Sequence, residues 1–397
     1  MEKESRVLKD VGVSAGQDTG TIVALDRKPN LICFSHLRWD FVFQRPQHLL
    51  TRFARTNSVH YWEEPVFVPG LVQPHLEARV AARNLTVVTP QLAEGLSEQV
   101  VEGQLKHLLD AYPAAKSAEI LWYYTPMMLP FSRHLDAACT VYDCMDELAN
   151  FRFAPPRLLD LEAELFERAD LVFTGGYSLY EAKRSRHASV HPFPSSVDIA
   201  HFAQARAIPT ENSIPTFGFY GVLDERFDID LLAAVADARP DWRFIMVGPI
   251  VKISPDELPK RDNLFYPGAA SYDDLPGLLA EWDVALMPFA INDATRFISP
   301  TKTPEYLAAG KPVVSTAIRD VVRHYGRLEG VKIAATAEEF VAGCDAALAL
   351  TQGDGEWLGE VDQALSAMSW DITQARMAGL IEQVANEQAD ATAGAVA

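Results

Sequence analysis

The sequence has few cysteines and no long apolar segment, and each shortage excludes a class of protein. Its four cysteines, Cys33, Cys139, Cys144 and Cys344, show neither CxxC nor CxxH spacing, so we expect reduced thiols rather than disulfides or a zinc site. No apolar run reaches the ~18 residues of a membrane span, and the N-terminus lacks the apolar core of a signal peptide. We therefore expect a cytoplasmic protein.

Positive charge is also in short supply. The chain has 35 Lys and Arg against 54 Asp and Glu, which gives a formal net charge of −19. A surface of this sign repels polyanions, so nucleic acid and an anionic membrane are excluded as partners of the whole surface. A small basic pocket remains compatible with this balance.

The length and the hydrophobic pattern indicate two α/β domains. At 397 residues the chain is too long for one ordinary core. Short β-type runs alternate with amphipathic helical runs, which is typical of parallel sheets covered on both faces. We expect two Rossmann-like, doubly wound domains facing a cleft, at residues 29–200 and 216–368, with a linker at 201–215. We expect the terminal segments, 1–28 and 387–397, to be disordered.

The first loop of the second domain, "GFYGVLDERFD", combines a glycine turn with an arginine. It lacks the full GxGxxG spacing, so it gives little support to a dinucleotide site. Gly221 would let backbone amides approach a phosphate closely, and Arg226 would present a planar fork of donors to it. An ordinary turn with a solvated arginine is the alternative.

The segment "SPTKTPEYLAAGKPVVST", residues 299–316, places charged residues where the chain enters a core. Pro304 suits the first turn of a helix, so Lys302 and Thr303 stand at a helix start, where an anion is favoured. Glu305 cannot hold that anion, but a carboxylate accepts hydrogen bonds from a vicinal diol such as a ribose. Phosphate and diol together indicate a nucleotide. The alternative is a surface i,i+3 ion pair.

These segments of the second domain, with "WRFIMVGP" and "LPGLLAEWDVALMPF", resemble the donor-binding domain of GT-B glycosyltransferases of the family-four group. In the first domain, "FSHLRWDFVFQRPQHLL" and "VYDCMDE" are similar to a bacterial subgroup that makes cell-surface polysaccharides. The resemblance implies that Glu305 holds the donor ribose and that Lys302 and Arg226 hold the diphosphate. It also implies close backbone approach at Gly221 and a helix at 369–386 that returns to the first domain.

The sequence departs from the family pattern at two positions. Many family-four enzymes have a Glu-x7-Glu motif, but Ile298 stands seven residues before Glu305, so the donor sugar cannot be inferred from the resemblance. Asp143 stands at a strand end where relatives often have a histidine.

The resemblance places the acceptor against the loops of the first domain, where "SHLRWDFVFQ" is too polar for a core. Aromatic rings beside paired donors suit sugars, and an arginine suits the phosphate of a carrier lipid. The predicted acceptor-binding residues are His36, Arg38, Trp39, Asp40 and Gln44. The alternative is a loop that closes over the sheet through buried arginine pairs, since Arg45 precedes Pro46 like a structural helix start.

Three carboxylates in "YDCMDE" follow a strand of the first domain. We predict Asp143 as the general base that takes the proton of the acceptor hydroxyl. Asp146 and Glu147 would face the same cleft, and the three could instead bind a metal. Lys302 and Arg226 make a metal unnecessary for a leaving diphosphate. A purely structural Asp143 is the remaining alternative.

The sequence thus predicts a glycosyltransferase that moves a sugar from a UDP- or GDP-sugar to a saccharide or lipid-linked acceptor, with neither cofactor nor metal. A membrane-borne acceptor would bring it to the inner face of the membrane. Two rivals remain. One is a nucleotide-sugar epimerase, for which the second domain lacks clustered acid–base groups, and the other is an inactive nucleotide-sugar-binding scaffold.

Overall fold

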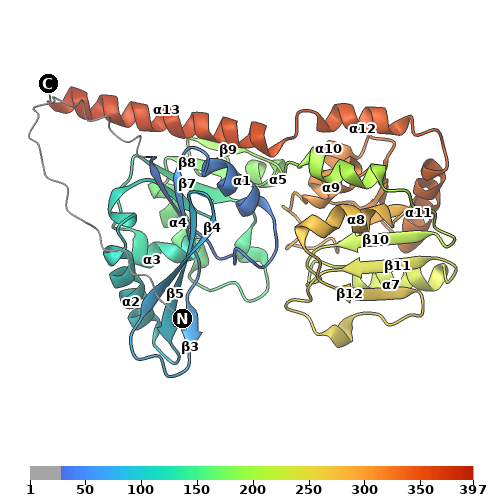
Figure 1. Ribbon diagram of the computed structural model, residues 1–397, viewed down its shortest axis with the longest axis horizontal. Coiled ribbons are helices and arrows are strands. Elements are labelled where there is room, and N and C mark those ends of the chain that lie inside the picture. Colours follow the sequence, from blue (N-terminus) through green and yellow to red (C-terminus); the bar gives the residue numbers. More distant parts are fainter. Residues whose placement is uncertain (1–27, 397) are drawn as a thin grey trace, which may run out of the picture.

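The computed structural model describes residues 28–396, which form two α/β domains side by side (Figure 1). Each domain is built on one sheet with helices packed against it, which confirms the two Rossmann-like domains predicted from the alternating pattern. The predicted N-terminal extension lies outside the described residues except for Lys28.

The first sheet is parallel apart from one hairpin. In the described chain it has nine strands, in the order β3-β5-β2-β1-β6-β7-β8-β9, with β4 antiparallel to β5. Both β2 and β6 pair with β1, so the strand order changes direction there. The strands are β1 (Asn30–Phe34), β2 (Ser58–Trp62), β3 (Val66–Val68), β4 (His75–Ala82), β5 (Leu85–Ala93), β6 (Ala118–Tyr123), β7 (Cys139–Cys144), β8 (Leu171–Thr174) and β9 (Val190–Pro192).

The second sheet is fully parallel, in the order β12-β11-β10-β13-β14-β15. Its direction changes at β10, which pairs with both β11 and β13. In open parallel sheets, ligands bind beyond the carboxyl ends of the strands at such a switch. The strands are β10 (Thr216–Tyr220), β11 (Arg243–Val247), β12 (Leu264–Gly268), β13 (Val284–Met287), β14 (Val313–Thr316) and β15 (Val331–Ala334).

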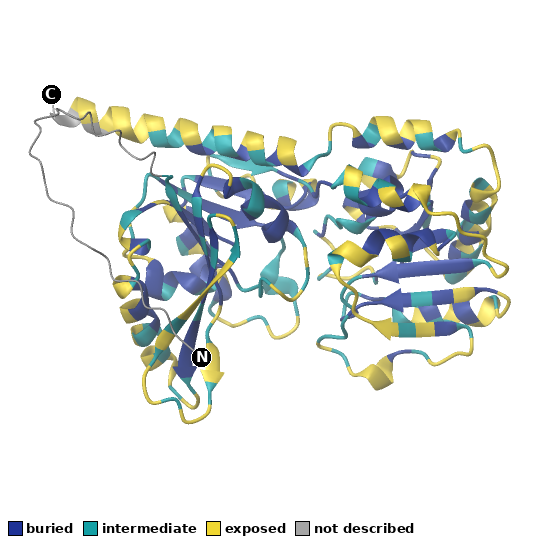
Figure 2. Cartoon of the chain, in the orientation of Figure 1, coloured by how far each residue is buried: buried dark blue, intermediate teal, exposed yellow. Residues whose placement is uncertain are grey.

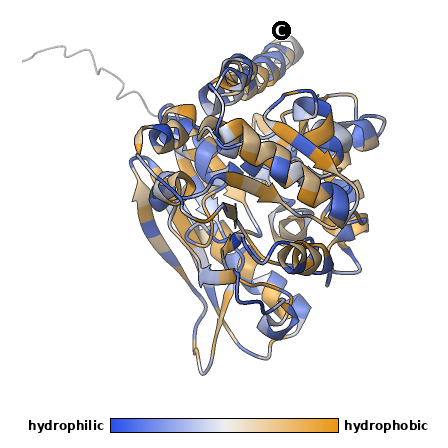
Figure 3. Cartoon of the chain, turned by 90° about the vertical axis from the view of Figure 1, so that its right-hand side faces the viewer, coloured by the Kyte–Doolittle hydropathy of each residue, from blue (hydrophilic) through white to orange (hydrophobic). Residues whose placement is uncertain are grey.

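The helices follow the strands in alternation. Those before the second sheet are α1 (Arg45–Phe53), α2 (Glu98–Ala111), α3 (Leu129–Ser132), α4 (Leu158–Arg168), α5 (Tyr177–Lys183) and α6 (Ile199–Phe202). Those after it begins are α7 (Ile229–Ala238), α8 (Leu275–Ala280), α9 (Lys302–Ala308), α10 (Arg319–Tyr325), α11 (Ala337–Thr351), α12 (Trp357–Leu365) and α13 (Trp370–Val396). Surface helices carry both hydrophobic and hydrophilic residues (Figure 3).

The strands are buried because both faces of each sheet are covered. In β1, Ile32 and Phe34 pack in one core, whereas Leu31 and Cys33 pack in the core on the other face. This division follows from the alternation of side chains along a strand. The central strands of the second sheet, β10, β13 and β14, are buried along their whole length (Figure 2).

Helix α13 lies along the first domain, although it follows the second in sequence (Figure 1). Trp370, Met377 and Ile381 are buried in a core of the first domain, and Asp371 pairs with Arg52 of α1 at 3.0 Å. The helix continues to Val396, so the prediction of a disordered tail from residue 387 is wrong. The tail sequence is rich in alanine and free of proline, which favours a helix.

The predicted linker at 201–215 is structured in its first part. Its first part belongs to α6 and to a 3-10 turn at Ala203–Ala207. Phe202 and Ala205 are buried in the core of the second domain. These residues therefore belong structurally to the second domain.

The chain crosses between the domains twice at one place. The backbone N–H of Val197, on the way into the second domain, donates to the carbonyl of Met368, on the way out, at 2.9 Å. The two domains are also in contact elsewhere, where the buried carboxylate of Asp320 on α10 accepts the backbone N–H of Ser178 on α5 at 3.1 Å. Within residues 28–396, no helix combines the length and the apolar character needed to cross a bilayer.

Candidate active site

The carboxyl ends of both sheets face a cleft that contains two connected compartments. The larger has a volume of about 400 Å³ and is lined by the first-domain loop from Trp39 to Gln44 and by second-domain residues after β10, β11 and β12. The smaller has about 100 Å³ and is lined on one side by residues after β7. Four residues line both compartments and form the neck between them: Gln44, Arg226, Thr301 and Lys302.

Lys302, the first residue of α9, lies directly against Gly221 in this neck. Gly221 has a φ of +140°, and a Cβ atom there would lie 2.1 Å from Cε of Lys302. The backbone conformation therefore requires glycine at position 221, and a side chain there would displace the end of the Lys302 side chain. The structure brings together two residues that are 81 positions apart, as their predicted roles require.

The ammonium group of Lys302 has no hydrogen bond or ion pair among the described residues, although acidic groups lie nearby. The centroid of the Phe219 ring lies 5.7 Å from it. Burial, and then the positive charge of Arg226, lower the pKa of Lys302 to about 8. A cation held in this way is stabilised by an anion that enters the neck.

Glu305 lines the larger compartment from the same helix. Its residue surface is only 5% exposed, and its carboxylate accepts a hydrogen bond from the Tyr220 hydroxyl at 2.5 Å. Burial raises the pKa of Glu305 to about 7, while Tyr220 and Lys302 act in the opposite direction. A carboxylate has about four acceptor positions, so the bond to Tyr220 leaves capacity for hydroxyl groups of a ligand.

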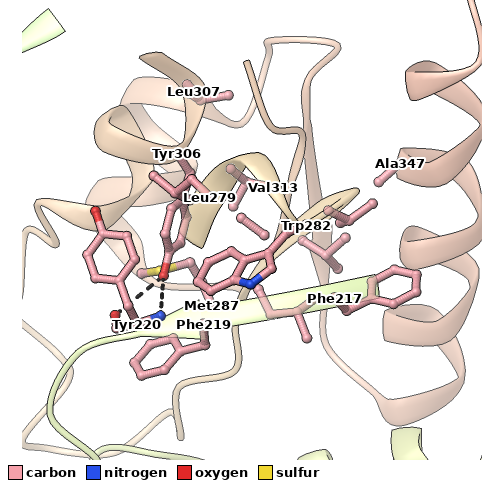
Figure 4. Packing of buried hydrophobic residues seen from close by; sticks show 14 of the residues in the cluster. Phe217, Phe219, Tyr220, Leu279, Trp282, Met287, Tyr306, Leu307, Val313 and Ala347 are labelled. Atoms are coloured by element: carbon pink, nitrogen blue, oxygen red, sulfur yellow. Dashed lines mark hydrogen bonds between the residues drawn. The ribbon is translucent and has the colours of Figure 1, made fainter. Parts of the chain in front are cut away.

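A tyrosine pair fixes the end of β10 to α9. The Tyr306 hydroxyl accepts the backbone N–H of Tyr220 at 3.0 Å and lies 3.4 Å from its carbonyl oxygen, as the dashed lines in Figure 4 mark. Tyr306 is fully buried in the core of the second domain. The glycine turn that follows Tyr220 is thereby held in register with Lys302 and Glu305.

Arg226 faces both compartments, but its guanidinium is already held. Asp224 accepts from Nε and Nη2 of Arg226 at 2.6–3.1 Å, and the ring of Phe151 lies 5.5 Å from the guanidinium. The ion pair orients the side chain and offsets its charge. Arg226 can still donate to a ligand from its remaining N–H groups.

Thr303 does not line either compartment, contrary to the prediction that it binds the donor. It is fully buried, and its hydroxyl has no partner among the described residues. Because successive residues of a helix point about 100° apart, Thr303 faces inward while Thr301, the N-cap residue, lines the neck.

The prediction that Asp143 faces the cleft is also wrong. Asp143 is fully buried, lines neither compartment, and accepts from Nε and Nη2 of Arg45 at 3.1 and 2.9 Å. Arg45 also donates to the carbonyl oxygen of Phe193 at 2.8 Å. Burial raises the pKa of Asp143, and Arg45 opposes this rise. A buried carboxylate needs such a partner, so this one serves the structural role considered as the alternative.

The other two carboxylates of "YDCMDE" differ from each other. Asp146 lines the smaller compartment, whereas Glu147 pairs with Lys183 of α5 at 2.8 Å. Over residues 28–396, no three His, Cys, Asp or Glu side chains are grouped to hold a metal ion. The sequence placed Asp146 near the cleft, but it did not distinguish it from its neighbours.

The predicted acceptor loop divides into two parts. Trp39, Asp40 and Gln44 line the larger compartment, and Asp40 also pairs with an exposed arginine, Arg79. Arg38 and His36 do not line either compartment, so the structure does not place these two where an acceptor in the cleft would lie.

Arg38 and His36 have different surroundings outside the two compartments. Arg38 pairs with Glu63 at 3.1 Å and donates to the carbonyl oxygens of Glu64 and Pro65. His36 is partly buried, and burial, followed by the charge of Lys252, lowers its pKa to about 4. Arg38 therefore holds the loop, whereas Nδ1 of His36 is buried without a hydrogen-bond partner among the described residues.

Comparisons with known proteins agree with this geometry. Residues 214–349 match the family model of glycosyl transferases group 1, which covers the strand, glycine turn and helix α9 of the site. A curated relative from Bacillus subtilis (strain 168), TuaH, is named for a glycosyltransferase role in teichuronic acid biosynthesis. It is 26% identical over 237 residues, which are 54% of this chain and 60% of the relative, so the match spans less than two thirds of that protein.

Solved structures match over nearly the whole chain. Sucrose-phosphate synthase from Thermosynechococcus elongatus has a TM-score of 0.68 at 14% identity, covering 90% of this chain and 99% of its own. Anabaena HepE, solved in complex with UDP and glucose, has a TM-score of 0.66 at 14% identity, covering 89% and 99%. The chain therefore has the GT-B fold, and its second domain matches the family model of glycosyl transferases group 1.

Proposed function

We propose that the protein is a glycosyltransferase that moves a sugar from a UDP- or GDP-sugar to a saccharide or lipid-linked acceptor. The observation that carries this proposal is Lys302, a cation with no ion-pair partner among the described residues. It stands in the neck between two compartments, against a glycine that leaves room for it. The diphosphate of a nucleotide sugar supplies the missing anion.

The larger compartment would hold the nucleoside. Its volume of about 400 Å³ lies within the range of small-molecule sites. Glu305 would accept hydrogen bonds from the two ribose hydroxyls, and Lys302 with Arg226 would hold the diphosphate. The same fold in HepE was solved with UDP and glucose bound.

The transfer would proceed without a metal. Negative charge grows on the diphosphate as the bond to the sugar breaks, and Lys302 and Arg226 are placed to stabilise it. We expect activity to survive treatment with EDTA followed by assay in metal-free buffer. Loss of activity that Mg²⁺ or Mn²⁺ restores would overturn this part of the proposal.

The acceptor would approach from the first domain, whose loop from Trp39 to Gln44 forms one wall of the cleft. The role in teichuronic acid biosynthesis that TuaH is named for supports a task in cell-surface polysaccharide synthesis. A membrane-borne acceptor would bring this cytoplasmic enzyme to the inner face of the membrane.

The test has two stages. The donor is first selected as the nucleotide sugar that raises the melting temperature of the protein. The release of UDP or GDP from this donor is then measured with and without saccharide acceptors. An enzyme of the proposed class releases the nucleotide faster when its acceptor is present. Binding without release would favour the inactive scaffold, and conversion of the bound sugar into its epimer would favour the epimerase.

A further inference from the structure

The smaller compartment adjoins the neck on the side away from the larger one, and the two share Gln44, Arg226, Thr301 and Lys302. If the diphosphate lies in the neck and the nucleoside fills the larger compartment, the group on the terminal phosphate lies in the smaller one. This step rests on the proposed function. The residues of the smaller compartment then contact the transferred sugar.

Each cation of this compartment has another partner. Arg45 is paired with Asp143. Arg226 is paired with Asp224, and its remaining N–H groups, like the ammonium of Lys302, would be engaged by the diphosphate. Apolar side chains, Ile298 among them, form another part of the wall. No basic group of the described compartment therefore remains to pair with an acidic sugar.

Asp146 is the carboxylate that lines this compartment. No hydrogen bond to its side chain is present among the described residues, so its oxygen atoms remain available to a ligand. Burial raises the pKa of Asp146 to about 6, while Arg226 and Arg45 act to lower it. The group is thus mainly ionised at neutral pH, and it accepts hydrogen bonds.

The backbone around Asp146 is held on both sides. Asp143 is fixed by Arg45, and Glu147 is fixed by Lys183 at 2.8 Å. A Cβ atom on Gly175 would lie 2.2 Å from the carbonyl oxygen of Met145, so the neighbouring strand end packs tightly on this loop. Asp146 is therefore presented to the compartment by a rigid segment, which favours a specific contact over a flexible one.

We propose that Asp146 binds hydroxyl groups of the transferred sugar and restricts the donor to a neutral sugar, excluding a uronic acid. An ionised carboxylate makes charge-assisted hydrogen bonds to hydroxyl donors. A second carboxylate in the same small space would be repelled, and no free cation there would compensate it. Asp146 is thus a specificity-determining residue.

The experiment compares three ligands by calorimetry: UDP, UDP-glucose and UDP-glucuronate, or GDP, GDP-mannose and GDP-mannuronate where guanine is the preferred base. The wild-type protein should bind the neutral donor at least about tenfold more tightly than the uronate donor. The Asp146→Asn variant should bind the neutral donor about tenfold more weakly, the loss expected for one charge-assisted hydrogen bond. Its affinity for the bare nucleotide should stay within about twofold, which also shows that it folds.

The matched control is Asp293→Asn, which removes an exposed carboxylate that lines neither compartment. It should bind all three ligands like the wild type. If the bare nucleotide binds but the wild type does not distinguish the two sugars, or Asp146→Asn leaves the affinity for the neutral donor unchanged, this inference is wrong while the proposed function stands. If neither UDP nor GDP binds, the proposed function is wrong and this inference falls with it.

Discussion

Arg45 and Lys302 line the same small compartment from opposite domains, yet their surroundings differ. Arg45 is buried, and it donates to both oxygens of Asp143 and to a backbone carbonyl. Lys302 has no such partner within residues 28–396, and its pKa falls to about 8. The comparison shows that position in a cleft does not by itself make a charge functional. A charge with a complete set of partners holds the fold, whereas one without them is suited to a ligand.

The largest effect is expected on the stability of the protein when the ion pair between Arg45 and Asp143 is broken. Asp143→Asn leaves Arg45 buried without its counter-ion, and this should cost about 3–5 kcal/mol of unfolding free energy. We expect the melting temperature to fall by about 10 °C, while Asp293→Asn stays within about 1 °C of the wild type. A variant that melts like the wild type but has lost its turnover would instead restore Asp143 as the general base.

The second largest effect is expected for the removal of the Glu305 carboxylate, which should weaken nucleotide binding. Glu305→Ala removes a charged acceptor of the ribose hydroxyls, and each such hydrogen bond contributes about 1.5–3 kcal/mol. We expect the Kd for the preferred nucleotide to rise at least about tenfold. The 2′,3′-dideoxy nucleotide should bind wild type and variant almost equally.

Measuring both nucleotides with both proteins shows whether the loss of affinity comes from the ribose hydroxyls. If the variant weakens both nucleotides to the same degree, Glu305 acts through the structure around Tyr220 and not through the diol. Unchanged affinity for UDP and GDP would remove Glu305 from the site.

The unpaired charge should show the opposite stability pattern to Arg45. Lys302→Met replaces a partly desolvated cation with an apolar side chain of similar length, so the free protein should be more stable by about 1 kcal/mol at pH 7. Thermal denaturation without nucleotide measures this difference. A clear loss of stability would mean that Lys302, like Arg45, holds the fold.

The smallest effect is expected in the pH dependence of binding. Glu305, with a pKa of about 7, accepts hydrogen bonds fully only above that pH, and Lys302, with a pKa of about 8, loses its charge above that pH. Nucleotide affinity should therefore rise towards pH 7 and fall beyond pH 8. Lys302→Met should lose the alkaline decline and keep the acid limb, whereas a flat wild-type profile would contradict both assignments.

The same two groups change the stability of the nucleotide-free protein in opposite directions as the pH rises. The raised pKa of Glu305 means that the folded state holds a proton more tightly than the unfolded state, so stability is lost as the pH rises from about 4.5 to 7. The lowered pKa of Lys302 means that stability is gained as the pH rises from about 8 to 10.5. Chemical denaturation across these two windows measures each contribution.

The second-domain site could be predicted because its signals are local. Lys302 and Glu305 are three residues apart on one short helix, and the glycine of the β10 turn appears in the sequence before the fold is known. Thr303 was misplaced because a shift of one position on a helix changes the face, and the helix start could not be fixed to one residue.

The first-domain site could not be predicted to the same degree, because its partners are distant in sequence. Asp143 and Arg45 are 98 positions apart, and only the fold shows that they meet. Asp143 and Asp146 occupy the same short segment. Whether each carboxylate is structural or accessible depends on Arg45, a buried arginine of helix α1. The sequence raised buried arginine pairs as an alternative but could not choose it.

The most direct test of the account is calorimetric titration of UDP and GDP into the wild-type protein and into Lys302→Met at pH 7.5. We predict that one of the nucleotides binds the wild type and that its affinity falls by about a hundredfold in the variant, while the variant without nucleotide melts no earlier than the wild type. Equal binding to both proteins, or no binding of either nucleotide to the wild type, would contradict the claim that Lys302 is the unpaired cation of a diphosphate site.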